Sequence, residues 1–363
     1  MYRLLLVVLS LVLVFISGCD ENNSQSKKNG NTESASEKNN NPAVRWKMAA
    51  AFPSSLVILG ETGIKFTAKI DEVSGSSIKI KYFEPNALVP PLEIFDAVSS
   101  GSIDAGWSTP GYWAGKIPAL QFFTTFPFGP APGEYFAWLR YGGGNEIFRE
   151  LYHEHNIHPI HCIATSPEAS GWFRKEIKTV EDLKGLKMRF FGLGAKVMEK
   201  LGVSTQLLAG GDIYPALELG TIDATEFAMP AIDIALGFND IADHYYFPGW
   251  HQPASLGELI INLDKWNFLS SQQRAQIEVT CGEMLLDSLA NSEAAQPPAI
   301  KKLEELGVQI HKWSPEMIAL FKEKWLEVVE EESEKNEQFS RVWNSVKKFR
   351  TSYARWRDLG YLK

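Results

Sequence analysis

The residues of this chain best suited to chemistry are a glutamate and an arginine associated with predicted strands. Residues 213–230, IYPALELGTIDATEFAMP, predict a short helix ended by Gly220 and then a strand that carries Glu226 at its far end. Ligands of open α/β sheets bind at strand ends, so Glu226 is the first candidate site residue. Arg189 lies in another predicted strand, and its guanidinium can hold a carboxylate through two parallel hydrogen bonds. The alternative for Arg189 is a solvated position at a sheet edge.

The sequence pattern that precedes Glu226 occurs twice. Residues 94–105, IFDAVSSGSIDA, match residues 213–224, IYPALELGTIDA, at six positions. The shared order of helix, glycine and strand predicts two lobes built on one plan, with both strands ending at a shared cleft. The first copy presents Trp107 where the second presents Glu226, so one wall of the cleft would be aromatic and the other anionic.

The remaining predicted elements alternate in the manner of a parallel α/β fold. Residues 44–52, 64–73 and 78–83 predict a strand, a helix and a strand, and a connection of this length joins parallel strands. Residues 315–359 are charged and amphipathic and predict a long terminal helix. The other predicted strands are 157–164, 187–191, 204–207, 256–262 and 308–313, and the other predicted helices are 133–142, 146–155, 194–201 and 270–303.

Composition and charge limit the class of protein. The 363 residues are enough for two domains, and a net charge of −8 argues against a nucleic-acid partner, which requires a basic face. Beyond Cys19, the chain has Cys162 in a predicted core strand and Cys281 in a predicted helix. For this pair, two buried free thiols and a disulfide both remain open.

The N-terminal segment predicts an exported protein. Residues 1–19 have an early Arg3, an apolar run and small residues, which together are typical of a secretory signal. Its end, Ile-Ser-Gly-Cys, resembles a bacterial lipobox and implies lipidation at Cys19, and the following Asp20 resembles an inner-membrane retention signal. Residues 20–43 lack large apolar side chains and predict a flexible tether. We therefore expect a periplasmic lipoprotein anchored to the inner membrane, with an uncleaved signal-anchor helix as the alternative.

Several motifs together resemble one protein family. Residues 178–189, KTVEDLKGLKMR, and residues 217–227, LELGTIDATEF, are similar to the solute-binding proteins of tripartite ATP-independent periplasmic (TRAP) transporters, the DctP family. Residues 171–177, GWFRKEI, Tyr112-Trp113, and residues 246–250, YFPGW, resemble the subgroup of 2-oxo-acid and mannitol/chloroaromatic-type binders. The similarity extends over about residues 44–355. It implies an α/β two-lobed periplasmic-binding-protein fold, type II-like, with hinge strands and a long C-terminal helix.

The resemblance also implies a binding site. In the subgroup an arginine, here Arg189, holds the ligand carboxylate, and a metal ion beside it is held by a glutamate and the next residue's carbonyl, here Glu226 and Phe227. Sodium-binding members have a glutamine as the third metal ligand, where this chain has Glu168. The alternative for Glu168 is a solvent-facing loop carboxylate.

Charge decides between metals. Glu168, Glu226 and a bound monocarboxylate exceed the charge of Arg189 by two negative charges, which a divalent ion cancels and sodium only halves. Oxygen ligands in irregular geometry suit calcium. We therefore predict Ca²⁺, bound together with the ligand, and keep Na⁺ as the alternative.

Two aromatic residues complete the predicted substrate-binding set. Tyr112 matches the position whose hydroxyl contacts the substrate in the subgroup, and Trp250 is a candidate to cover the ligand. Core packing is the alternative for Trp250 and for the neighbouring Trp113.

The predicted domains follow the resemblance. Lobe I comprises residues 44–163 and 228–254, and lobe II comprises residues 164–227 and 255–313, with hinges near Ala164 and Phe227. The segment 314–363 is predicted to span both lobes or to form a homodimer interface.

The predicted function is the capture of a small monocarboxylate, such as the 2-oxo acid pyruvate or the 2-hydroxy acid lactate, and its delivery to the membrane subunits of a TRAP permease. The alternative is a metal-dependent lyase or hydrolase acting on small organic acids. Binding is favoured because no His or Lys is placed with the site carboxylates as an evident general base. The four histidines of residues 153–161 lack the HExxH spacing of a zinc site.

Overall fold

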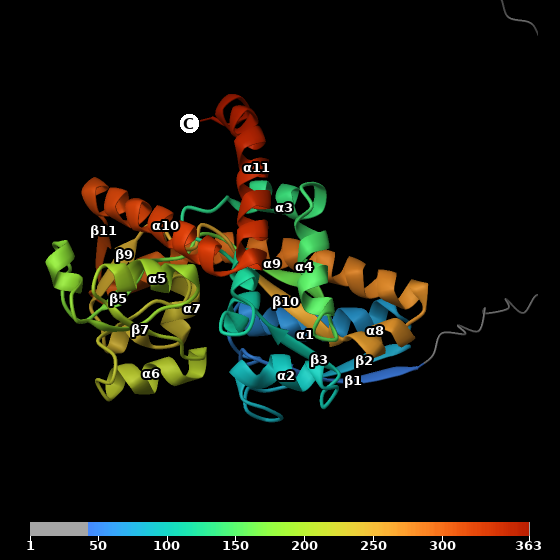
Figure 1. Ribbon diagram of the computed structural model, residues 1–363. Coiled ribbons are helices and arrows are strands. Elements are labelled where there is room, and N and C mark those ends of the chain that lie inside the picture. The colour runs from blue at the N-terminus through green and yellow to red at the C-terminus, as the bar shows by residue number, and fades with distance from the viewer. Residues whose placement is uncertain (1–42, 363) are drawn as a thin grey trace, which may run out of the picture. The chain divides into compact units, whose positions relative to one another are not determined.

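The computed structural model describes residues 43–362, and these contain two β-sheets (Figure 1). The predicted signal peptide, the lipidation site Cys19 and the tether up to residue 42 lie outside the described residues. One sheet is five-stranded with the order β2-β1-β3-β10-β4, and the other is six-stranded with the order β11-β9-β5-β8-β6-β7. We call these sheets A and B. The predicted α/β class is confirmed.

Sheet A lies on the right in Figure 1 and sheet B on the left. In sheet A, β1 pairs in parallel with β2 and β3, whereas β10 runs antiparallel to β3 and β4. Its strands are β1 (Val44–Ala50), β2 (Ile78–Phe83), β3 (Ala105–Ser108), β4 (Ile157–Thr165) and β10 (Ser255–Asn262). In sheet B, β6 pairs in parallel with β7 and β8, whereas β5 runs antiparallel to β8 and β9. Its strands are β5 (Gly171–Phe173), β6 (Lys187–Arg189), β7 (Ser204–Gln206), β8 (Ala224–Thr225), β9 (His244–Phe247) and β11 (Gln309–Lys312).

The predicted internal duplication is confirmed by the order of the strands. In each sheet a first strand lies between the two strands that follow it in the chain, β2-β1-β3 in sheet A and β7-β6-β8 in sheet B. The helices of the two units are α1 (Leu59–Val73) and α2 (Ile94–Ser99), and α5 (Leu193–Lys200) and α6 (Gly210–Glu218). The shared glycines, Gly101 and Gly220, both have a left-handed backbone, with φ of 75° and 69°, which glycine adopts without steric cost.

The predicted domain boundaries assigned two strands to the wrong lobe. Strand β9 pairs with β5 and β11 in sheet B, although residues 228–254 were expected in lobe I, and β10 is in sheet A, although residues 255–313 were expected in lobe II. The chain passes from sheet A to sheet B at residues 166–170 and returns at residues 248–254. The first passage lies next to the predicted hinge at Ala164. The predicted hinge at Phe227 is not at a passage, because β8 and β9 share sheet B.

A long helix and a disulfide secure the first passage. Helix α9 (Ser271–Glu305) packs along β4, and Cys281 of α9 forms a disulfide with Cys162 of β4, with Cα atoms 4.4 Å apart. The backbone N–H of Ala164 and that of Ser166 donate to Ser288 Oγ and Ser292 Oγ of α9, at 2.9 and 2.8 Å. The alternative of two free thiols is therefore wrong.

The C-terminal segment forms two helices where one was predicted. Helix α10 (Pro315–Lys335) ends before Asn336, whose extended backbone breaks the helix and whose side chain accepts the Phe339 N–H to begin α11 (Glu337–Gly360). Helix α10 packs on α5 of the sheet B side, whereas α11 packs on helices of the sheet A side and rises away from them in Figure 1. The segment thus contacts both lobes, as one of its two predicted roles required. None of the described helices is long and apolar enough to cross a membrane.

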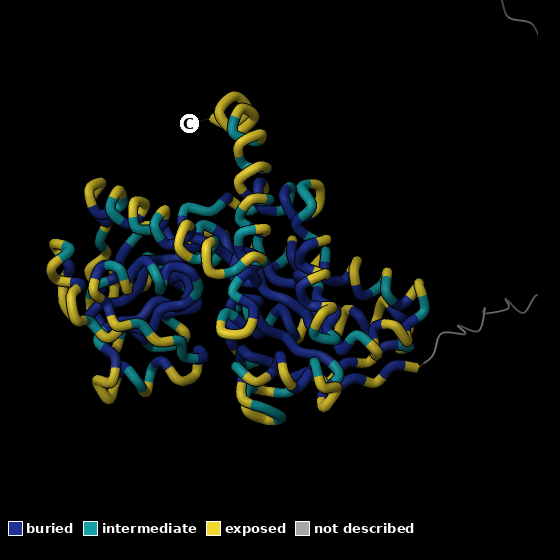
Figure 2. The backbone as a smooth tube through the Cα atoms, in the orientation of Figure 1, coloured by how far each residue is buried: buried dark blue, intermediate teal, exposed yellow. Residues whose placement is uncertain are grey.

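The core continues through both sheets, whose strands are mostly buried (Figure 2). The other α-helices are α3 (Pro132–Tyr141), α4 (Gly144–His153), α7 (Pro230–Ala235) and α8 (Leu263–Phe268). The 3₁₀ helices are η1 (Pro91–Glu93), η2 (Pro110–Trp113), η3 (Pro118–Phe123), η4 (Val180–Leu183) and η5 (Phe238–Asp240).

Candidate functional site

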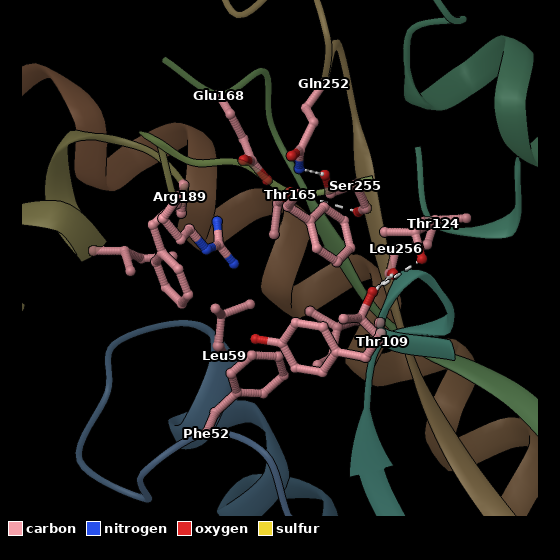
Figure 3. Close-up of a pocket in the computed structure, with 17 residues that line it drawn as sticks. Phe52, Leu59, Thr109, Thr124, Thr165, Glu168, Arg189, Gln252, Ser255 and Leu256 are labelled. Carbon is pink, nitrogen blue, oxygen red and sulfur yellow. Dashed lines mark hydrogen bonds between the residues drawn. The ribbon is translucent and has the colours of Figure 1, made fainter. Parts of the chain in front are cut away.

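A cavity lies between the two sheets, lined by residues of both. Sheet A and its connections supply mainly apolar and hydroxyl side chains, among them Phe52, Leu59, Thr109 and Tyr112, whereas sheet B supplies Arg189. Glu168 and Gln252, from the segments 166–170 and 248–254 between the sheets, and Ser255 at the start of β10 also line it. In Figure 3 the Arg189 guanidinium and the Glu168 carboxylate point toward the same space. The duplicated strands therefore end at a shared cavity, as expected.

Arg189 ends β6 and is buried, with 1% of its surface exposed, so the alternative of a solvated edge residue is wrong. Its Nη1 donates to Glu226 Oε1 and to the Glu226 backbone carbonyl, both at 2.7 Å, and its Nε donates to the Leu208 carbonyl at 3.2 Å. The guanidinium lies over the Phe227 ring, 5.2 Å from its centre. Three hydrogen bonds thus hold the guanidinium through Nη1 and Nε, and they do not use the hydrogens of Nη2.

Glu226 follows β8 and is fully buried. Its Oε1 accepts the Arg189 Nη1–H and the backbone N–H of Phe191, and its Oε2 lies 3.4 Å from His251 Nε2. Burial by itself would raise the pKa of Glu226, but the Arg189 guanidinium and then His251 outweigh burial and hold this pKa below its usual value. Glu226 is therefore an anion at neutral pH.

Glu168 is a second buried carboxylate beside the first. Only 5% of its surface is exposed, so the alternative of a solvent-facing loop carboxylate is wrong. Its Oε2 has no hydrogen-bond partner among residues 43–362. Burial and then the charge of Glu226 raise the pKa of Glu168 well above its usual value. A cation between the two carboxylates would satisfy the unpaired oxygen and remove the repulsion.

The described residues contain one group of three side chains arranged to hold a metal ion: Glu168, Glu226 and His251. Each offers one ligand atom, and these atoms lie within 4.8 Å of one another. The oxygen-rich donors fit a hard cation such as calcium or sodium. Phe227 lies directly after Glu226 and its ring lines the cavity wall, so its position is compatible with the predicted carbonyl ligand.

Sequence reasoning gave no role to His251 and Gln252, and its expectation that no His lies with the site carboxylates is wrong, because His251 contacts Glu226. His251 and Gln252 lie in the passage that returns from sheet B to sheet A, and both are buried. Gln252 Nε2 donates to Ser255 Oγ at 2.7 Å, while its Oε1, on a residue that lines the cavity, has no partner among the described residues. Their only local signal is that they follow the subgroup motif YFPGW.

The predicted aromatic contacts divide into two groups. Tyr112 lines the cavity and its ring meets Phe191 of the opposite lobe edge to face, with centroids 5.6 Å apart. Burial raises the pKa of Tyr112, and the nearby Arg189 guanidinium partly offsets this rise, so the phenol stays protonated. Trp250 instead stacks on Phe321, with centroids 4.6 Å apart, and is not among the residues that line the cavity. Its position matches the packing alternative.

Trp107 does not form a wall of the cavity, so that prediction is wrong. Its Nε1 donates to the Leu59 carbonyl at 3.0 Å and its ring stacks on Phe66, because α1 covers the face of β3 from which it projects. Phe52 and Tyr112 supply the aromatic wall in its place.

The histidine cluster lies outside the cavity. His153 Nε2 and His158 Nδ1 are 3.1 Å apart, and His161 Nε2 pairs with the Phe123 carbonyl at 2.9 Å. Burial lowers the pKa of His158 to about 3 and that of His161 to about 4. These two residues are neutral packing residues at the junction of α4 and β4.

Comparisons with known proteins identify a family and give binding precedents. A family model described as DctP, bacterial extracellular solute-binding protein, family 7, matches residues 49–336. The chain is 36% identical over 323 residues to the monocarboxylate 2-oxoacid-binding periplasmic protein all3028 of a Nostoc species, covering 88% of each chain.

Two solved structures resemble the fold closely. One is a TRAP transporter solute-binding protein from Bordetella bronchiseptica, a mixed occupancy dimer with copurified calcium and picolinate in its bound active site. It shares 37% identity and a TM-score of 0.85, with coverage of 87% of this chain and 94% of the other. The second is a TRAP periplasmic solute-binding protein from Pseudoalteromonas atlantica with bound sodium and pyruvate. It shares 32% identity and a TM-score of 0.83, with coverage of 86% of this chain and 96% of the other.

Proposed function

The chain belongs to the DctP family of bacterial extracellular solute-binding proteins, and we propose that it captures a small 2-oxo or 2-hydroxy monocarboxylate, such as pyruvate or lactate, together with a calcium ion. Its role in transport follows from the family. It acts in the periplasm as the solute receptor of a TRAP transporter, and the enzyme alternative is set aside because the family and the similar structures are receptors. The identity of the acid and the identity of the ion are the parts we propose.

One observation carries the choice of ion: the unpaired Oε2 of buried Glu168, beside buried Glu226. Arg189 is the only cationic side chain of Lys or Arg type that lines the cavity among the described residues, and it already forms an ion pair with Glu226. With Glu168 ionised as a metal ligand, adding a ligand carboxylate leaves two surplus negative charges in a buried space, which is costly without a divalent ion. The similar protein with calcium supports this choice, and the one with sodium supports the alternative.

The arrangement implies how the groups share the ligand. Glu168, Glu226 and the Phe227 carbonyl would hold the ion, with His251 supporting Glu226 from behind. The Nη2 group of Arg189, whose hydrogens the three hydrogen bonds of its guanidinium do not use, would donate to the ligand carboxylate. When bound, the ion would draw the ligand's carboxylate and 2-oxo or 2-hydroxy oxygen toward the two glutamates. The Tyr112 hydroxyl would meet the ligand from the other lobe.

Calorimetry tests this proposal directly. Pyruvate is titrated into the protein after chelation with EGTA, and then with calcium or with sodium restored. We expect tight binding with calcium and a large loss of affinity in EGTA that sodium only partly restores. Affinity that EGTA leaves unchanged would reject calcium, and failure to bind any of a panel of 2-oxo and 2-hydroxy acids in any of these salts would reject the proposed function.

Anchoring and assembly remain proposals as well. The lipobox-like sequence before Cys19 supports attachment to the inner membrane. The exposed apolar side chains Trp356, Leu359 and Leu362 at the end of α11, together with the dimer of a similar protein, support a homodimer through this helix. Sedimentation of the full chain and of a chain ended after Arg350 would test the dimer, since the shorter chain should be monomeric.

A further inference from the structure

Each lobe contains a buried carboxylate held by the same two kinds of donor. In sheet A, Glu258 accepts the Trp113 Nε1–H at 2.8 Å and the Tyr152 hydroxyl at 2.7 Å. On the sheet B side, Asp233 of α7 accepts an indole N–H at 2.9 Å, from Trp172, and a phenol hydroxyl at 2.7 Å, from Tyr245. Both carboxylates are at least 99% buried, and neither lines the cavity. The two carboxylates therefore have similar hydrogen-bond donors but lie in different lobes.

Asp233 has one contact that Glu258 lacks. Its Oδ1 accepts the backbone N–H of Ala228 at 3.2 Å, and Ala228 directly follows Glu226 and Phe227. The carbonyl of the same Ala228 accepts the backbone N–H of Ala169 at 2.9 Å, and Ala169 directly follows Glu168. Ala228 is thus the link between the two segments that carry the proposed metal ligands. Asp233 fixes this link from the core side.

We propose that Asp233 is a positioning residue for the cation site: through Ala228 it sets the spacing between Glu168 and the Glu226–Phe227 segment without touching the ion. This inference rests on the proposed cation site. Trp172 and Tyr245 belong to neighbouring strands of sheet B and stack with centroids 3.9 Å apart, so Asp233 is anchored in the rigid part of that lobe. Outer groups that hold metal ligands in place commonly change metal affinity about 10- to 100-fold when they are mutated.

The chemistry of the contacts requires a carboxylate at position 233. The two oxygens of Asp233 accept hydrogen bonds from three donors, the indole N–H, the phenol hydroxyl and the backbone N–H. Asparagine would keep one acceptor oxygen and place an NH₂ group against at least one of the donors. The Asp233→Asn substitution therefore removes at least one of the hydrogen bonds that hold residue 233, and it does so with almost no change in side-chain volume.

The experiment compares Asp233→Asn with the matched control Glu258→Gln, which makes the same chemical change against an indole and a phenol in the other lobe. Calcium alone is titrated into each protein by calorimetry, and thermal unfolding is measured in EGTA. We expect both variants to be destabilised in EGTA. Only Asp233→Asn should lose calcium affinity, by about tenfold or more. Amide hydrogen exchange should become faster at Ala228 and Ala169 in this variant and stay unchanged at both positions in Glu258→Gln.

The outcomes separate the inference from the function on which it rests. Calcium affinity that is equal in Asp233→Asn and the wild type, or an equal loss in Glu258→Gln, overturns the positioning role. A wild type that binds no cation refutes the proposed site itself. If Asp233→Asn does not fold, Tyr245→Phe removes one anchor with little change in volume: a loss of about threefold or more supports the role, and unchanged affinity overturns it.

Discussion

The two duplicated units have the same strand order and present different chemistry at the cavity. The unit of sheet A contributes Tyr112 and apolar or hydroxyl groups to the lining, whereas the unit of sheet B contributes Arg189, which is held by Glu226, a buried residue outside the lining. The hydroxyls of Thr109 and Thr124 already bond to each other at 3.0 Å, so sheet A offers little charge or free polarity. Duplication therefore explains where the cavity is, and the residues at the ends of β3, β6 and β8 make its two sides chemically different.

The asymmetry suggests an order of binding. The charged groups of sheet B are held in place by hydrogen bonds before any ligand is bound, and such preorganised groups recognise an anion at small entropic cost. In the proposed complex the sheet A lobe would then add Tyr112 and an apolar wall that excludes water. Differential contacts of this kind are what a ligand needs to stabilise a closed state. The following predictions test whether sheet B dominates recognition, from the largest expected effect to the smallest.

Arg189→Ala should produce the largest effect. It removes the guanidinium proposed to hold the ligand carboxylate, so pyruvate affinity measured by calorimetry should fall by more than about a hundredfold. It also leaves Glu226 buried beside a second carboxylate, and loss of one partner of a buried pair costs about 3–5 kcal/mol in the free energy of unfolding. Arg189→Lys retains the charge and should be better folded while still binding weakly. Micromolar binding of pyruvate by the alanine variant would show that residues outside sheet B recognise the ligand.

Glu168→Gln should change the preferred ion. The substitution removes one of the two surplus charges, so calcium affinity should fall about tenfold or more, and sodium should then support pyruvate binding as well as calcium does. Calorimetry of pyruvate in each salt measures this. An unaltered preference for calcium would mean that residue 168 does not contact the ion.

The buried carboxylates predict a dependence of stability on pH. Burial raises the pKa of Glu258 from 4.5 to about 8. Because the folded state binds this proton more tightly than the unfolded state does, its contribution to stability is complete below about pH 4.5 and is lost as the pH rises toward 8. The slope is at most about 1.4 kcal/mol per pH unit. Glu258→Gln should remove this part of the dependence in urea unfolding from pH 5 to pH 8. A slope equal to that of the wild type would contradict the assignment.

Tyr112→Phe should have the smallest effect. It removes one hydroxyl and keeps the ring that packs on Phe191, so pyruvate affinity should fall only about three- to tenfold. Calorimetry in calcium is the measurement, with circular dichroism as a control for folding. A loss as large as that of Arg189→Ala would show that the two lobes contribute equally.

Much of the fold followed from local patterns, and several long-range features did not. The spacing of apolar residues predicted α9 and β2 well, because periodicity reports the faces of an element. It could not show that β9 joins sheet B and β10 joins sheet A, since alternation within a strand says nothing of its neighbours. It also missed the break at Asn336, where the side chain caps a new helix inside a continuous amphipathic pattern.

The sequence by itself determined the duplicated plan, the strand that ends before Glu226, and the arginine of β6, because these depend on residue type and short-range order. The resemblance had placed Glu168 and Glu226 at one metal ion, but only the tertiary structure brought His251 to them, since the three lie on segments that meet through pairing between distant strands. The tertiary structure also decided that Trp107 packs in the core while Tyr112 faces the cavity, because a helix covers one face of β3. Burial and charge interactions depend on which distant segments lie next to each other. Packing decides this, and no local sequence pattern records it.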